Sequence, residues 1–397
     1  MIKEYIKGLI KLPFYFLGDL IYFLAYFIPK KKNLWLIGSW VGEKYNDNSR
    51  HFFEFLLYEK PKDIQFFWIT KNKKIICELK KNDIPVINSH SLKGIWLTLR
   101  AKVLIMSSNL LDINYKFLIT DNQIKIQLWH GIPLKKIGYD ANLGLGLKVQ
   151  DILKYIFPFY YKYRYDLIPV TSNLMRERVS TGLRIEKTKL PILGLPRTDI
   201  FFKEKKESKK TAILFAPTFR RQGLVDFPPY LPDKKYLEKI DLLMEKINGV
   251  FKIKLHYLDE KFLRKIKTDN LKRVVFIDAD PLYDLQRELL NTDILITDYS
   301  SIYFDFLLLN RPVIFSAFDV EYYTTKDQGL YEDFENIAAG YIVKNWREIL
   351  KFIEKTIEKD EFSEKRKEVK LRYWDKSVID SSACLRIFEK IKEMAGI

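Results

Sequence analysis

Cysteine and histidine are scarce in this chain. It has two cysteines and four histidines among 397 residues. Cys77 and Cys384 lie far apart and have neither a metal-binding nor a redox spacing, which predicts reduced thiols in a cytoplasmic protein. The sequence also has no Walker A loop and no GxGxxG run. These absences argue against a disulfide scaffold and against the two best-known glycine-rich phosphate loops.

Metal ligands are scarce as well. Asp278-Ala279-Asp280 is the one carboxylate pair that invites a divalent cation. We interpret Asp280 instead as a helix N-cap, with Pro281 at the first helical position and a helix running toward Leu290. No other cluster of carboxylates or histidines has ligand spacing, and no Ser-His-Asp arrangement can be assigned. The sequence therefore predicts neither a metal site nor a cofactor.

Positive charge is abundant. The chain has 68 Lys and Arg against 51 Asp and Glu, a net charge of +17. Such an excess favours anionic partners: nucleic acid, an anionic membrane face or phosphorylated substrates. The charge is spread along the chain and no nucleic-acid-binding motif accompanies it, so a nucleic-acid partner is not expected. With 47% hydrophobic residues the chain can bury the cores of two domains.

The N-terminal region is strongly apolar. Residues 12–29 are apolar except for Asp19 and the small Gly18, and lysines lie on both sides. No small-residue cleavage site follows, so a signal peptide is not expected. The stretch is barely long enough to span a bilayer, and Asp19 lies near its middle. We predict an interfacial helix on the cytoplasmic membrane face, and a spanning helix or a core helix remain the alternatives. Residues 147–165 also mix aromatic and basic side chains and could extend that surface.

Short apolar runs alternate with helix-like stretches from residue 33 onward. This alternation is typical of parallel α/β sheets and predicts two Rossmann-like domains that face a central cleft lined by strand ends. The expected strands are residues 33–38, 65–70, 85–88, 103–106, 124–129, 167–170 and 190–193, then 212–216, 251–255, 274–277, 294–297 and 313–315. The expected divisions are a membrane-associating segment 1–32, an acceptor domain 33–193, a donor domain 194–375, and a C-terminal helix 376–397 that packs back on the first domain.

Residues 293–319 form the most informative stretch. A predicted strand ends at Thr297, a short turn carries Ser300 and Ser301, and an apolar helix is expected over residues 302–309. The start of such a helix suits a phosphate, because free N–H groups and the helix dipole meet there. Asp305 lies inside this apolar helix, and a charge at that position is costly unless something binds it.

Other candidate residues also follow predicted strands. His130 comes after the strand 124–129. Gly131 would let a ligand or another backbone segment approach closely, and Lys135 adds positive charge. His256 ends a second strand, in which alternation places Lys254 on the same face. A hydroxyl and a guanidinium that suit phosphate, Thr218 and Arg220, follow the strand 212–216.

Together these residues make the chain resemble the CDP-glycerol glycerophosphotransferase family, which builds teichoic acid and related capsular polymers. The matching segments, in the family's order, are WHGIPLKKIGYD (129–140), TSN (171–173), GLPRTD (194–199), APTFR (216–220), KLH (254–256) and ITDYSSIYFDFLLLNRPVIFSAFD (296–319). The resemblance covers roughly residues 33–380. It implies an α/β fold of the GT-B type, a CDP-activated polyol as donor, and an undecaprenyl-diphosphate-linked saccharide as acceptor. It also implies a peripheral position on the cytoplasmic face of the cell membrane.

The resemblance also implies roles for individual residues. His130 would be the general base on the acceptor hydroxyl, and His256 would contact the transferred phosphoryl group. Ser300 and Ser301, with Thr218 and Arg220, would hold the donor diphosphate, and Asp305 would bind the donor ribose. Gly131, Lys135, Lys254 and Arg197 would supply further acceptor or phosphate contacts.

Two features depart from the family pattern. Tyr257 follows the second histidine where proline is common, and the late glycine-lysine-serine element is reduced to Asp375-Lys376-Ser377. Two other functions stay open. A GT-B glycosyltransferase that uses a nucleotide sugar would share Asp305, and a non-enzymatic binder of anionic polymers would share the charge. The polyol, the acceptor and the oligomeric state are not determined by the sequence.

Overall fold

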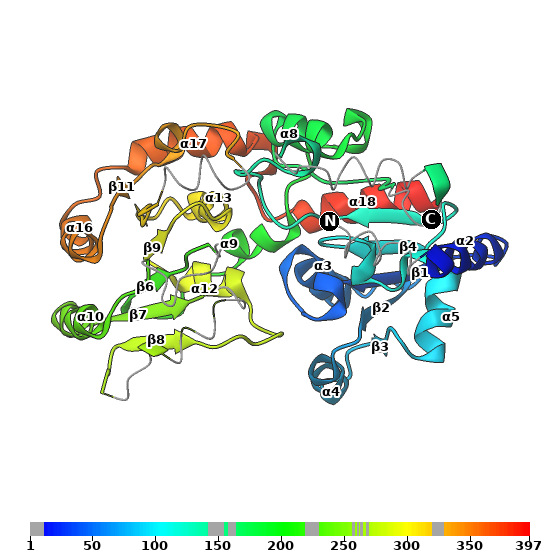
Figure 1. The fold of residues 1–397 in the computed structure, drawn as a ribbon, viewed down its shortest axis with the longest axis horizontal. Helices are drawn as coiled ribbons and strands as arrows, with labels where there is room; N and C mark the ends of the chain where they lie inside the picture. The colour runs from blue at the N-terminus through cyan, green and yellow to red at the C-terminus, as the bar shows by residue number, and fades with distance from the viewer. Residues whose placement is uncertain are drawn as a thin grey trace.

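The computed structural model describes residues 12–141, 155–157, 164–218, 230–255, 259, 262, 265–266, 270–319 and 329–397. Its described strands form two separate parallel sheets, one of five strands and one of six. Figure 1 shows the two sheets side by side, each covered by helices. We call each sheet with its helices a half: the first half contains the N-terminal sheet, and the second half contains the other.

The sheet of the first half has the strand order β3-β2-β1-β4-β5. Its strands are β1 (Lys31–Gly38), β2 (Gln65–Thr70), β3 (Val86–Asn88), β4 (Ala101–Met106) and β5 (Ile124–Gln127), and its helices include α3 (Asp47–Glu59), α4 (Lys73–Lys81) and α5 (Leu92–Arg100). Trp35, Leu36 and Ile37 of β1 are fully buried. Such continuous apolar runs are expected in parallel strands covered on both faces.

The sheet of the second half has the order β11-β10-β9-β6-β7-β8. Its strands are β6 (Thr211–Phe215), β7 (Gly249–Lys254), β8 (Val274–Ile277), β9 (Ile294–Thr297), β10 (Val313–Phe315) and β11 (Tyr341–Ile342). Its described helices include α10 (Lys234–Lys246), α12 (Leu285–Asn291), α13 (Ile302–Phe306), α15 (Phe334–Ile337) and α16 (Trp346–Glu358). The turn that carries the two serines follows β9, at the centre of this sheet.

The halves are joined twice along the chain. The first connection runs through α8 (Asn173–Leu183), the 3₁₀ turn η6 (Pro196–Thr198) and α9 (Ile200–Lys203), and the second through α17 (Ser363–Tyr373). The last helix, α18 (Ala383–Ala395), returns to the first half, where Phe388 packs on Trp35 with ring centroids 5.8 Å apart. Asp199 caps α18 by accepting hydrogen bonds from the N–H groups of Ala383 and Cys384.

Direct contacts also join the halves. Tyr45 donates its backbone N–H to the carbonyl of Pro281 (2.7 Å), and Arg50 donates to that of Leu282 (2.8 Å). Asp284 lies 3.5 Å from both Arg50 and His51 of α3. Burial opposes ionisation of Asp284, but the neighbouring histidine and guanidinium outweigh it and hold the pKa of this carboxyl well below its usual range.

The structure corrects two sequence expectations. Residues 167–170 and 190–193 form single bridges, Ile126 with Leu167 and Val170 with Ile192, rather than strands. The helix expected at Asp280-Pro281 begins at Leu285, and Asp284 is its N-cap. The reason is that the carbonyls of Pro281 and Leu282 are bound by the first half, which keeps this stretch a turn. The helix expected over residues 302–309 is confirmed, since α13 ends at Phe306 and a 3₁₀ turn continues it from Leu307 to Leu309.

The apolar N-terminal stretch forms helix α2 (Leu12–Tyr26). Its contact with the first half includes the buried Tyr22 and Ala25. Its exposed side chains include the apolar Phe16, Leu17, Leu20, Phe23 and Leu24, followed by Phe27 just beyond the helix. In the part of the chain that the structure describes, no helix combines the length and the hydropathy needed to cross a bilayer. The second aromatic and basic stretch, 147–165, lies mostly outside the described residues, although Phe157 packs on Tyr15 and Phe16 of α2.

Candidate active site

The loop after β5 carries His130 in a constrained backbone. Trp129 has a φ of 63° and Gly131 a φ of 141°, so the chain turns sharply on both sides of the histidine. Asn48, in the first turn of α3, holds the loop by hydrogen bonds. Its side-chain amide donates to the carbonyls of Leu128 (3.1 Å) and Trp129 (2.9 Å). The main chain of the histidine loop is therefore held by a side chain of α3.

The His130 ring is half-buried between aromatic side chains. Trp129 stacks on it with centroids 4.8 Å apart, and Trp40 approaches edge-on at 5.8 Å. Nδ1 lies 3.4 Å from the carbonyl oxygen of Ser107, which fits a tautomer with the proton on Nδ1 and leaves Nε2 as the acceptor. Burial lowers the pKa of His130 and outweighs the opposite effect of the Asp47 carboxylate. A neutral imidazole near pH 7 can take a proton from a substrate.

The serine turn of the second half lies against this loop. A Cβ atom built on Gly131 would lie 2.7 Å from the Ser301 hydroxyl oxygen and 3.0 Å from Nη2 of Arg197. A side chain at position 131 would therefore push aside the Ser301 hydroxyl and the Arg197 guanidinium, and the positive φ also favours glycine there. Thr218 joins the same region, because its N–H donates to both carboxylate oxygens of Asp298, at 2.9 and 3.0 Å. Asp298 lies in the turn that carries Ser300 and Ser301.

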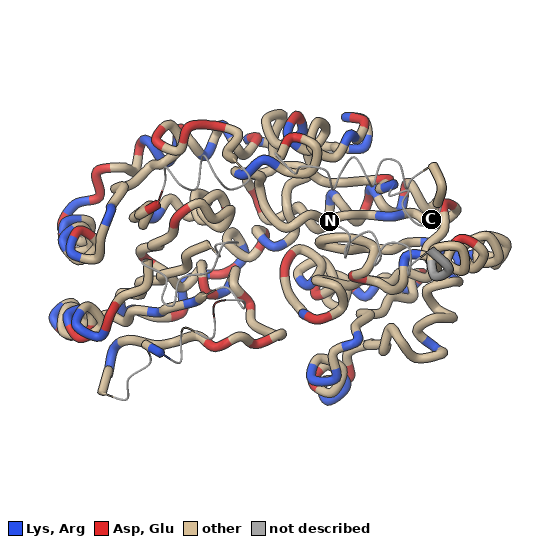
Figure 2. Tube along the Cα trace, viewed as in Figure 1, with Lys and Arg blue, Asp and Glu red and all other residues tan. Residues whose placement is uncertain are grey.

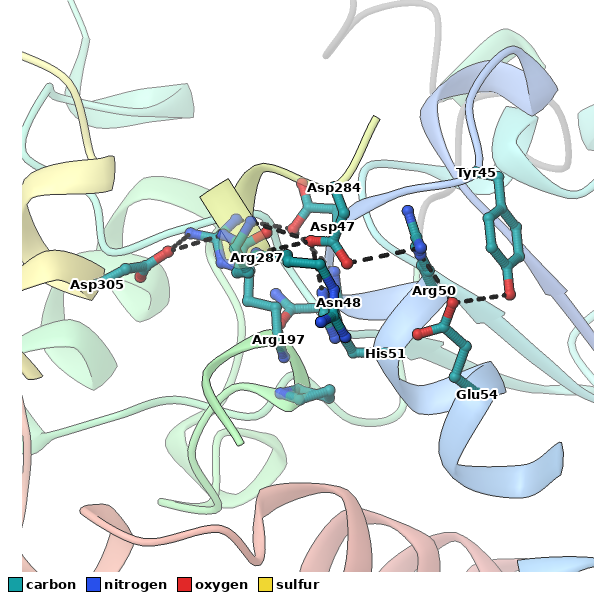
Figure 3. Close-up of polar contacts among 12 residues, drawn as sticks. Tyr45, Asp47, Asn48, Arg50, His51, Glu54, Arg197, Asp284, Arg287 and Asp305 are labelled. Atoms are coloured by element: carbon teal, nitrogen blue, oxygen red, sulfur yellow. Dashed lines mark hydrogen bonds and ion pairs between the residues drawn. The ribbon is translucent and has the colours of Figure 1, made fainter. Parts of the chain in front are cut away.

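Arg197, in η6, connects the two halves at this point. Its Nη1 donates to Asp47 Oδ1 (2.7 Å) and to the carbonyl oxygen of His130 (2.9 Å), and its Nη2 lies 2.8 Å from Asp305 Oδ2. Figure 3 shows Arg197 between the two carboxylates, one on α3 and one on α13. We call Arg197, Asp47 and Asp305 the Arg197 ion-pair group. Burial disfavours the charge on Arg197, but the two acids outweigh it and raise its pKa.

Asp305 is buried completely. Besides Arg197, it receives a hydrogen bond from Gln286 Nε2 at 3.3 Å. Burial raises the pKa of Asp305 to about 6, against the opposing effect of Arg197. The costly carboxylate in the apolar helix thus has a cationic partner in the protein itself.

The remaining predicted residues have described contacts with other residues or lie outside the described residues. Lys135 forms an antiparallel bridge with Leu330, which ties the continuation of the histidine loop to the second half. Lys254 lies over the Tyr283 ring, 5.2 Å from its centroid. His256 and Arg220 lie outside the described residues. The described residues contain no cluster of three or more His, Cys, Asp or Glu side chains that could hold a metal ion.

Several residues of the site were not expected from the sequence. Asp47 and Asn48 hold Arg197 and the histidine loop, and Asp112 accepts backbone hydrogen bonds from Val41 (2.7 Å) and Ser108 (2.7 Å). Asp112 thereby joins the loops that follow β1 and β4. The run Asn46-Asp47-Asn48 is typical of a helix start, but nothing in its spacing indicates contact with residues 80 to 150 positions away.

The fold resembles solved structures over its full length. The wall teichoic acid polymerase TagF superposes with a TM-score of 0.72 at 21% identity, covering 100% of this chain and 98% of that one. This likeness confirms the expected two-sheet GT-B fold. The class that the fold defines is the GT-B class of two-sheet α/β proteins, with the histidine loop on one half and the serine turn on the other.

The particular family follows from the sequence comparison. The family model for CDP-glycerol:poly(glycerophosphate) glycerophosphotransferase matches residues 20–393, and the chain belongs to this family. Among curated relatives, a teichoic acid poly(glycerol phosphate) polymerase of Bacillus spizizenii is 28% identical over 83% of this chain and 85% of its own length. A teichoic acid glycerol-phosphate transferase of Staphylococcus aureus is 27% identical over 98% of this chain and 100% of its own length. The expected activity class, polyol-phosphate transfer from a CDP-activated donor, is that of the family.

Proposed function

We propose that the protein transfers glycerol phosphate from CDP-glycerol to a hydroxyl of a lipid-linked saccharide or a growing teichoic-acid-like polymer and releases CMP. One observation carries the assignment of the site: a histidine with a lowered pKa lies in a loop that contacts both Ser301 and the buried Arg197. A base and groups that bind anions are the two requirements for an alcohol that attacks a diphosphate.

In this mechanism Nε2 of His130 accepts the proton of the acceptor hydroxyl. The oxygen attacks the phosphorus that carries the glycerol, the P–O bond to the cytidine side of the diphosphate breaks, and CMP leaves. Ser300, Ser301 and Thr218 would donate to the diphosphate, together with Arg220, and Asp305 would accept from the ribose. His256 would contact the phosphoryl group in flight. Its role and that of Arg220 rest on the family resemblance.

The division of labour between the halves is part of the proposal. Residues 33–193 would form the acceptor domain and residues 194–375 the donor domain, with 1–32 on the membrane and 376–397 returning to the acceptor domain. His130 lies in the first of these ranges, and Ser300, Ser301 and Asp305 lie in the second. Donor and acceptor would thus meet between the two sheets.

The test is a donor panel read by nucleotide release. The full-length protein is incubated with CDP-glycerol, CDP-ribitol or UDP-sugars and an undecaprenyl-diphosphate-linked disaccharide. We expect CMP from CDP-glycerol, dependent on the acceptor. Release of UDP without CMP would favour the nucleotide-sugar alternative. No turnover of any donor, combined with binding of anionic polymer, would favour a non-enzymatic role.

The acid side of the pH profile should lie below the ordinary histidine range. His130 acts as a base only when it is neutral, and burial lowers its pKa from the reference value of 6.5. A lowered pKa keeps the base deprotonated to lower pH, so the rate should fall only as the pH drops below that value. The measurement is kcat/KM for CDP-glycerol between pH 5 and 8. An acid limb at or above pH 6.5 in the wild type would contradict this expectation.

We also propose that α2 binds the cytoplasmic face of an anionic membrane. Its apolar side chains point away from the protein, and the exposed Lys31 and Lys32 follow closely. Helix α5 lies near the end of α2, since Lys30 donates both to the carbonyl of Ala25 (2.9 Å) and to that of Leu99 (2.8 Å). Helix α5 adds the exposed Trp96, and tryptophan side chains favour membrane interfaces.

Figure 2 shows lysine and arginine mixed with acids on the outer helices of both halves, unlike the continuous basic stripe of a nucleic-acid binder.

Replacing exposed apolar residues of α2 should release the protein from vesicles. The triple substitution Phe16→Ser, Leu20→Ser and Phe23→Ser removes three side chains that are each more than half exposed. Each contributes on the order of 1–2 kcal/mol to partitioning, so binding to vesicles with anionic lipid should fall at least about tenfold. Sedimentation with vesicles measures it, and activity on a soluble acceptor should persist. Tyr58→Ser, at an exposed site on α3, is the control. Equal binding by the triple variant and the wild type would exclude α2 as the anchor.

A further inference from the structure

Two carboxylates from different halves share one buried guanidinium, and the two contacts differ in kind. Arg197 donates a hydrogen bond to Asp47, whereas its Nη2 forms no hydrogen bond with any described residue although Asp305 Oδ2 lies 2.8 Å away. The contact with Asp305 is therefore an ion pair without good hydrogen-bond geometry. Asp47 is the partner that holds the guanidinium in place.

Asp47 is itself well held. Its Oδ2 accepts from the Trp40 indole (3.2 Å), and its Oδ1 accepts from the N–H of Asn48 (2.8 Å). Asp47 has a φ of 63°, an unusual conformation for a residue that is not glycine. Functional sites often keep such conformations because the surrounding contacts determine them. The side chain of Asp47 is thus fixed before any substrate binds.

Three buried polar atoms at the contact with Asp305 lack hydrogen bonds. Within the described part of the chain, Nε and Nη2 of Arg197 and Oδ1 of Asp305 have no hydrogen-bond partner. Buried donors and acceptors are almost always paired, so these atoms point to a missing ligand. A ligand that satisfies both residues offers a hydroxyl to the carboxylate and an anionic oxygen to the guanidinium. A nucleoside diphosphate has both, on the ribose and on the phosphates.

We propose that Asp47 is a positioning residue for the transfer reaction. When the donor binds, a ribose hydroxyl takes the place of Arg197 at Asp305, and Nη2 turns to a diphosphate oxygen. Asp47 keeps Nη1 hydrogen-bonded to the carbonyl of His130 throughout. The phosphate contact of Arg197 and the imidazole of His130 therefore keep a fixed distance from each other. This inference rests on the proposed function, because it needs a nucleotide donor and a base at position 130.

Loss of Asp47 should lower the rate of transfer more than the affinity for the donor. Without Asp47, the Arg197 guanidinium would bind Asp305 or the phosphate and would lose its hydrogen bond to the histidine loop. The donor could still bind through its other contacts, but the base would be poorly placed. A 1 Å displacement of a reacting group can cost about 100-fold in rate. A merely structural Asp47 would instead affect stability, binding and rate together.

The experiment compares Asp47→Asn, Asp47→Glu and Arg197→Lys with Glu59→Gln, an exposed residue at the other end of α3. CMP affinity is measured by calorimetry, kcat by CMP release from CDP-glycerol, and folding by thermal melting. We expect Asp47→Asn to lower kcat at least about tenfold more than it lowers CMP affinity. Asp47→Glu should recover part of the rate, and Glu59→Gln should match the wild type. An unchanged kcat in Asp47→Asn, or parallel losses of kcat and affinity, would overturn the proposal.

A second readout does not depend on turnover. The chain has four histidines, so the imidazole signals can be assigned by single substitutions in NMR spectra of the full-length protein. CMP should shift the His130 signal in the wild type and Glu59→Gln, and the shift should be lost in Asp47→Asn. A wild-type protein that shows this shift but releases no CMP would contradict the proposed function alone. A His130 signal that ignores bound CMP, or that responds equally in Asp47→Asn, would overturn the positioning role even in an active enzyme.

Discussion

Replacing His130 by alanine is expected to abolish transfer and to leave the affinity for the CDP donor almost unchanged. Among the described histidines, His130 is the one whose loop lies against Ser301 and whose carbonyl oxygen accepts a hydrogen bond from Arg197. A positioned general base contributes roughly 10²- to 10⁴-fold to rate. The donor groups come instead from the second half. Single-turnover CMP release measures the loss, and calorimetry with CMP measures the affinity.

The control for this variant is His90→Ala. His90 is exposed and stacks on Tyr115, 5.0 Å away between ring centroids, so its loss should change neither rate nor affinity. His130→Gln tests whether a side chain that only fills the space between Trp40 and Trp129, without acting as a base, supports transfer. A glutamine variant with wild-type rate would assign the base elsewhere, and His256 would then be the next candidate.

Replacing Asp305 is expected to have the opposite signature. Asp305→Asn should weaken CMP binding by about 10- to 100-fold, because the ribose loses a charged acceptor worth about 1.5–3 kcal/mol. Asp305→Ala should also destabilise the protein by up to about 3 kcal/mol, since removing one partner of a buried ion pair leaves the other uncompensated. Asp47 still pairs with Arg197 and limits that cost. Thermal melting and calorimetry measure the two effects.

The matched control for Asp305 is Asp333→Asn in the same half. Asp333 is exposed and makes no side-chain cap to helix α15, so neither stability nor affinity should change. CMP affinity in Asp305→Asn equal to that of the wild type would count against the ribose role. It would leave Asp305 as a residue that only pairs with Arg197 across the two halves.

The strands were predictable because of how parallel sheets are built. Strands buried on both faces need uninterrupted apolar runs, and β2, β8, β9 and β10 coincide with the runs expected from the sequence. Isolated bridges are harder, because residues 167–170 have the same composition as a strand but pair with β5 through one residue alone. The two-residue β11 has too little pattern to be recognised.

Contacts between the halves could not be predicted in this way. The expected helix cap at Asp280 was wrong because the pattern of an N-cap and a proline ignores what approaches from the other half. Tyr45, more than 200 positions earlier, binds the Pro281 carbonyl and keeps the turn open. Asp47 and Arg197 meet across 150 positions, and local spacing has no information about such pairs.

In the sequence, the candidate site was indicated by the residues that follow predicted strands, and not by the buried polar residues that hold them in place. His130, Gly131, Ser301, Arg197 and Asp305 each follow a strand or lie at the connection between halves, and the structure brings them together. Their chemical roles stay predictions. The residues that hold them in place, Asp47, Asn48 and Asp112, were missed because buried polar networks leave no periodic pattern in a sequence.

The return of α18 to the first half has a consequence for biosynthesis. Ile387 and Phe388 of this helix share a core with Trp35 and Phe52, which the ribosome makes more than 300 residues earlier. The first sheet therefore cannot complete its hydrophobic packing until residues 383–395 have emerged. During translation its apolar face would stay uncovered while the whole second half is made, and this delay exposes the nascent chain to aggregation. Truncation near the C-terminus should accordingly impair folding of the N-terminal sheet, far away in sequence.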